Sequence, residues 1–80
     1  MRLTVHAGDI LVATPYPDLH RTTIVARHPD AVVWNIQVHA SELLLAAATP
    51  TLHDAILKVL RNGQLIEVLR ADVKRLDGKD

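Results

Sequence analysis

The amino-acid sequence predicts a small α+β domain in which helices cover one face of a mostly antiparallel sheet of three to five strands. Two runs rich in β-branched residues flank His28-Pro29-Asp30-Ala31, which indicates a central hairpin over residues 21–39. Apolar residues then recur at helical spacing over residues 52–61, which indicates an amphipathic helix. A chain of 80 residues is expected to form one domain over residues 1–80.

The hairpin prediction includes a turn and a register. Pro29 and Asp30 suit the two central positions of a type I turn. In the simplest register Val25 lies opposite Trp34, and His20 lies opposite His39. Alternation along the strands then places Trp34 on the core side of the sheet and both histidines on the outer side.

The second half of the chain predicts two helices. A short helix over 41–48 consists of good helix formers, with Ser41 as its cap and Thr49-Pro50 as its end. The longer helix over 52–61 is followed by Asn62-Gly63, which suits a left-handed C-terminal stop. Both helices are expected to pack on the sheet.

The ends of the chain are expected to add strands. Residues 1–13 have the composition of β-structure, and the two prolines within 14–19 indicate a loop. Residues 64–76 fit either a strand or a helix. We favour a strand to Arg70 followed by a turn, because a sheet of three or more strands is more stable than a lone hairpin.

Composition restricts the class of protein. Nine basic and nine acidic residues give a formal charge of zero, and there is no cysteine, which favours a reducing cytoplasm and excludes a disulfide framework. The longest apolar run is far too short to span a bilayer. Hydrophobic residues make up 49% of the chain, more than one small core hides, which favours self-association.

These features predict a small accessory protein that acts by binding another protein, as a homodimer. A composition rich in Ala, Arg, Val, Asp and His and poor in Lys and Phe is typical of a GC-rich bacterial or phage genome. The candidate contacts are the aromatic of a Pro-Tyr-Pro segment and leucines expected at helix borders. They are Tyr16, Leu43, Leu44 and Leu57.

A nucleic-acid-associated regulator is the alternative, because basic residues gather in the C-terminal third. The candidates are Arg61, Arg70, Lys74 and Arg75. A histidine-dependent or metal-dependent enzyme comes third, since the expected register brings His20 and His39 together. No catalytic residue and no cofactor are predicted, because the sequence has neither a nucleophile motif nor a glycine-rich phosphate loop.

Overall fold

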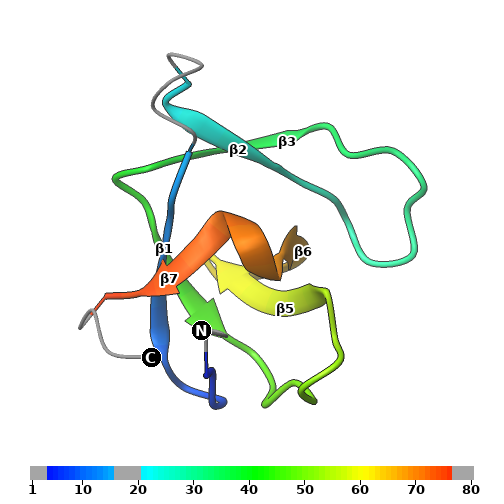
Figure 1. Cartoon of the computed structure of the whole chain (residues 1–80). Helices are drawn as coiled ribbons and strands as arrows, with labels where there is room; N and C mark the ends of the chain where they lie inside the picture. Colours follow the sequence, from blue (N-terminus) through cyan, green and yellow to red (C-terminus); the bar gives the residue numbers. More distant parts are fainter. Residues whose placement is uncertain (1–3, 16–20, 77–80) are drawn as a thin grey trace.

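The computed structural model describes residues 4–15 and 21–76 and consists almost entirely of β-structure (Figure 1). Within this part of the chain the only helical segment is one 3-10 turn, η2, at Arg70–Asp72. The strands are β1 (Ile10–Ala13), β2 (Thr23–Ala26), β3 (Ile36–His39), β4 (Leu43–Ala46), β5 (Ile56–Arg61), β6 (Gln64–Leu69) and β7 (Val73–Arg75).

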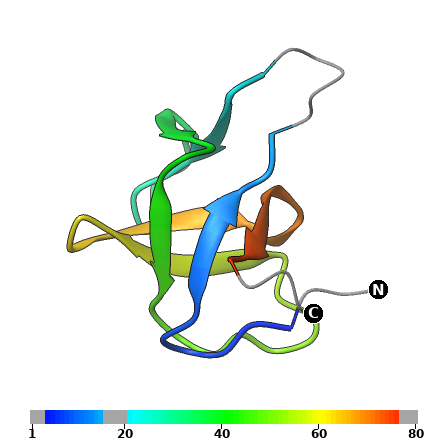
Figure 2. The ribbon, with the colours of Figure 1, turned by 90° about the vertical axis from the view of Figure 1, so that its left-hand side faces the viewer.

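Five of the strands form one antiparallel sheet in the order β6-β5-β4-β1-β7, and β2 pairs with β3 in a second sheet. One bridge joins the sheets, because Arg27 and Glu67 exchange two backbone hydrogen bonds of 3.0 and 2.8 Å. In both views the strands curve around a common interior, with β4 and β1 side by side (Figure 2). The result is a small barrel-like fold with a β2–β3 hairpin beside the larger sheet.

The core is aliphatic and draws on both sheets. Its largest fully buried side chains are Leu11, Leu44, Ile66, Val38, Val59 and Val68. Other buried residues, Leu57 and Ile24 among them, complete it, and Ile36 packs against its edge. Among the described residues no aromatic side chain is buried. The core that the described residues form therefore lacks large rings, which contribute much apolar area per residue elsewhere.

The α+β prediction is wrong, because both predicted helices are strands. Residues 41–48 contain β4, in which exposed and buried side chains alternate. Residues 52–61 form a turn followed by β5, which also alternates along Ile56–Val59. Apolar runs of this kind satisfy either period, and pairing with β1 and β6 overrides the helix propensity of Leu and Ala.

The Asn62-Gly63 dipeptide forms the turn between β5 and β6. Arg61 pairs with Gln64, so only two residues connect β5 to β6. Both have positive φ, 52° for Asn62 and 79° for Gly63. These angles are typical of a type I′ hairpin turn, for which Asn-Gly is the preferred pair. The same dipeptide also suits a helix stop, because αL residues occur in both settings.

The predicted β2–β3 hairpin exists, but its register is shifted by three residues. Thr23 pairs with His39 rather than Ile36, and Val25 pairs with Gln37 rather than Trp34. An odd shift moves the side chains of β2 to the other face relative to β3, so Val25 is exposed and Ile24 is buried instead. Trp34 lies before the start of β3 and is only half-buried, not in the core.

The turn of this hairpin also differs from the prediction. Ala31 N–H donates to the His28 carbonyl at 3.1 Å, so a four-residue turn does form. However, Asp30 has a φ of 64°, which suits the third position of a type II turn and not of a type I turn. The predicted strand from residue 64 is confirmed as β6, which η2 follows.

Candidate interaction surface

Three neighbouring strands, β7, β1 and β4, present an almost wholly aliphatic outer face. Ile10 pairs with Leu45, and Val12 pairs with Leu43 on one side and Lys74 on the other. Leu76 follows β7 directly and donates its N–H to the Ile10 carbonyl at 2.9 Å. We call these six residues the outer aliphatic face: Ile10, Val12, Leu43, Leu45, Lys74 and Leu76.

The alternation of the strands explains why this face points away from the core. In β1 and β4 the residues between the outer ones, Leu11, Ala13, Leu44 and Ala46, are buried. The outer ones keep much of their surface, with exposed fractions of 58% for Leu43, 56% for Leu76, 40% for Ile10 and 38% for Leu45. Apolar residues that are exposed together on adjacent strands mark an interaction surface, whereas scattered ones do not.

A hollow of about 350 Å³ opens at one end of the outer aliphatic face. It is lined by Asp9, Ile10, Arg75 and Leu76. Two aliphatic walls and two charged residues of opposite sign therefore surround a space that could receive an apolar side chain.

Charge is nearly absent from the outer aliphatic face and is neutralised at its border. Lys74 is its single charged residue. Next to Leu43, the carboxylate of Glu42 accepts hydrogen bonds from Arg61 Nε at 2.8 Å and Arg61 Nη2 at 3.2 Å. This contact and the His39 N–H lower the pKa of Glu42. Glu42 thus remains an anion beside the face.

The predicted interaction residues occupy different places. Leu43 belongs to the outer aliphatic face, whereas Leu44 and Leu57 are core residues with exposed fractions of 1% and 2%. Tyr16 lies outside the described residues. Four members of the face, Ile10, Val12, Leu45 and Leu76, were not predicted, although the alternation of two four-residue apolar runs, 10–13 and 43–46, could have identified the first three.

Among the predicted nucleic-acid residues, Arg61 and Arg70 make defined contacts within the chain. Arg61 binds Glu42. Arg70 donates to two backbone carbonyls, those of Thr51 at 2.8 Å and Leu52 at 3.3 Å. Lys74 and Arg75 are neighbours on β7. Arg61 and Arg70 therefore stabilise the fold through contacts within the chain, and these contacts give no support to a nucleic-acid site.

The histidine prediction gains no structural support within the described residues. His39 Nδ1 accepts a hydrogen bond from Ser41 N–H at 3.1 Å, which requires that nitrogen to be unprotonated. Its predicted neighbour, His20, lies outside the described residues. Across 4–15 and 21–76 no three His, Asp or Glu side chains come together as a metal site would require.

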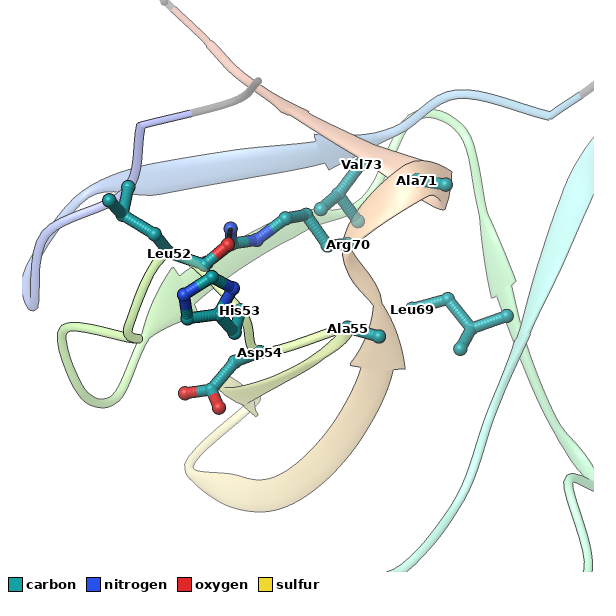
Figure 3. A pocket seen from close by; sticks show the side chains of 8 residues that line it. All are labelled: Leu52, His53, Asp54, Ala55, Leu69, Arg70, Ala71 and Val73. Atoms are coloured by element: carbon teal, nitrogen blue, oxygen red, sulfur yellow. Dashed lines mark hydrogen bonds between the residues drawn. The ribbon is translucent and has the colours of Figure 1, made fainter.

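A larger hollow of about 490 Å³ lies between the 51–55 turn and η2 (Figure 3). Its polar lining residues are His53, Asp54 and Arg70. The Arg70 side chain extends from η2 toward Leu52, where it fixes the turn. Hydrogen bonds from Thr51 lower the pKa of the exposed Asp54 carboxyl. The hydrogen bonds of Asp54 and Arg70 thus stabilise the turn that forms one wall of this hollow.

A third hollow, of about 510 Å³, lies where the β2 strand faces η2. Its lining includes Trp34, Leu69, Arg21 and Asp72. Burial raises the pKa of Asp72, and the nearby Arg21 charge offsets part of that effect. The negative charge of Asp72 and the positive charge of Arg21 offset each other, so the lining of this hollow favours neither an anionic nor a cationic ligand.

Comparison with known proteins adds no family. No protein-family model, curated protein or solved structure matches the chain. No helix in the described ranges is long and apolar enough to cross a membrane.

Proposed function

We propose that this chain is a protein-binding module whose working unit is a homodimer joined through the outer aliphatic face. The observation that supports this function is that four of the five outward residues on three adjacent strands are aliphatic, as is Leu76 directly after β7, and the fifth is a single lysine. The cysteine-free sequence suits the cytoplasm, where we propose that the protein acts.

A second copy fits this face better than a different protein does. A two-fold interface places the same surface against itself, and an aliphatic surface with few charges can meet its own copy without like-charge repulsion. Two sheets that pack face to face lie about 10 Å apart, and side chains of this size interdigitate between them. A small core without buried aromatics among the described residues also gains the most from additional apolar burial.

Sedimentation equilibrium at tens of micromolar tests this proposal. The native chain should have the mass of a dimer, and Leu43→Lys should be monomeric because it places a charge at the most exposed leucine of the outer aliphatic face. Leu52→Lys is the matched control, since Leu52 is 70% exposed and lies in the 51–55 turn. It should remain dimeric.

Circular dichroism should show the same β-spectrum for all three proteins. A monomeric native chain under these conditions would overturn the proposal. So would a dimer that survives Leu43→Lys but is lost in Leu52→Lys, because the interface would then lie elsewhere.

A further inference from the structure

The middle strand of the outer aliphatic face suits a two-fold axis. β1 lies between β7 and β4, and its outward residues, Ile10 and Val12, are uncharged. A two-fold axis brings the residues beside it against their own copies, so any charge near it would meet a like charge. Along β1 no such conflict arises.

We propose that two copies pack face to face about a two-fold axis that runs parallel to β1, an arrangement that rests on the proposed homodimer. Because β7 and β4 flank β1 on opposite sides, this axis exchanges their positions. Leu45 then lies against Leu76 of the partner subunit, and Lys74 lies against Leu43 of the partner subunit. Ile10 meets its own copy.

The hollow at the end of the face gives the first reason for this choice. Its aliphatic walls are Ile10 and Leu76, and the axis along β1 directs the partner's Leu45 into it. An axis that runs across the strands would instead bring the partner's Lys74 there. A leucine in this hollow covers the apolar surface of Ile10 and Leu76 and adds no further charge beside Asp9 and Arg75.

The position of Lys74 gives the second reason. With the axis along β1, Lys74 approaches the partner's Leu43, and the next residue in the chain is Glu42, whose carboxylate is paired with Arg61. With the axis across the strands, Lys74 would approach the partner's Leu76, which lines the hollow together with Asp9 and Arg75. The first arrangement therefore places the lysine beside an ion pair that is already neutral, whereas the second one adds a third charge to the hollow.

Cysteine cross-linking distinguishes the two arrangements, because the native chain has no cysteine. Facing sheets lie roughly 10 Å apart, too far for a disulfide but within reach of a short bis-maleimide. An isotope-labelled Leu45→Cys chain is mixed with an unlabelled Leu76→Cys chain, and mass spectrometry counts the mixed product. The matched control mixes Leu43→Cys with Leu45→Cys, the pair that the axis across the strands would bring together.

The 45–76 mixture should give at least several times more mixed product than the 43–45 mixture. The reverse ratio, or equal yields, would overturn the proposed axis. The proposed homodimer would still stand in that case, provided that each cysteine variant sediments as a dimer. A monomeric mass for the native chain would remove both.

A charge exchange gives an independent readout. Leu43→Lys should be monomeric, since it sets two lysines against each other across the interface. Adding Lys74→Glu to it should restore the dimer, because the lysine introduced at position 43 then faces the glutamate introduced at position 74 of the other copy. Lys74→Glu combined with Leu52→Lys serves as the control for net charge. Failure of the double variant to dimerise more strongly than Leu43→Lys alone would contradict the arrangement.

Discussion

The two hairpins of this fold are held in register by different means. The β5–β6 hairpin closes with two residues of positive φ, and six consecutive residue pairs follow from that turn. The β2–β3 hairpin has four pairs and a loop over residues 27–35. Local turn chemistry therefore fixes the first register, while the second depends on contacts with the rest of the molecule.

Those contacts are concentrated at Arg27. Its backbone pairs with Glu67, and its Nε donates to a Glu67 carboxylate oxygen at 2.7 Å. The guanidinium also lies 4.8 Å from the centre of the Trp34 ring, a cation–π distance. One residue thus connects the β2 strand, its loop and β6. A hairpin whose turn does not fix its register therefore depends on contacts with other parts of the molecule. We call the contacts of Arg27 with Glu67 and Trp34 the tertiary anchor of the β2–β3 hairpin.

The largest effect should come from removing core volume from each hairpin. Ile66→Ala in β6 and Ile24→Ala in β2 each remove a buried isoleucine, and each should cost about 2–5 kcal/mol of unfolding free energy. Urea unfolding followed by circular dichroism measures both. Similar losses are expected because, despite their different turns, the hairpins share one core.

The control for that comparison is Val25→Ala, which trims an outward residue of the same strand. It should change stability by no more than about 0.5 kcal/mol. If Ile24→Ala were as mild as Val25→Ala, β2 would contribute little to the core, and the β2–β3 hairpin would be a separate, weaker unit.

The tertiary anchor is tested by Arg27→Met, which keeps an apolar stem but removes the cation. Glu67 is only 8% exposed and would lose its partner, so a loss of about 1–3 kcal/mol is expected. Arg61→Met removes a more exposed ion pair and should cost no more than about 1 kcal/mol. Equal losses in urea unfolding would show that Arg27 has no special role in holding the β2–β3 hairpin.

The turns themselves should differ in their response to alanine. Gly63→Ala introduces a Cβ with nothing within 4 Å, so its cost is conformational, from the φ of 79°, and should be about 1–2 kcal/mol. Asp30→Ala, at a φ of 64° in the longer loop, should cost less than about 0.5 kcal/mol, since that loop can adjust. Thermal melts of both variants would contradict the comparison if Asp30→Ala proved the more destabilising.

The same contrast explains which parts of the fold could be predicted. Two runs around residue 30 predicted a hairpin correctly, but the register depended on Arg27 and Glu67, which are 40 residues apart in the chain. The helix prediction over 52–61 was wrong because its apolar residues fit two periods. Only the Asn-Gly turn and the pairing of Arg61 with Gln64 across it resolve that ambiguity.

The candidate surface was predictable only in part. Leu43 was recognised as a candidate contact, but the helical interpretation placed Leu44 beside it. The strand separates them, since successive residues point to opposite faces. Ile10 and Leu76 meet Leu45 on one face only because β1 lies between β4 and β7, an order that no local pattern indicates.

The smallest expected effect concerns Glu42. This residue follows β3 and joins that segment to the last residue of β5, Arg61, by a hydrogen bond. Its pKa is lowered in the folded chain, so the folded state binds fewer protons there than the unfolded state. The resulting stability is present above the usual glutamate pKa and is lost as the pH falls through the lowered value. Glu42→Gln should therefore be about 0.5 kcal/mol less stable than the native chain at neutral pH. Urea titrations at a series of pH values should show this difference shrinking toward zero in acid, and a difference that grows with falling pH would mean that the carboxylate does not stabilise this junction.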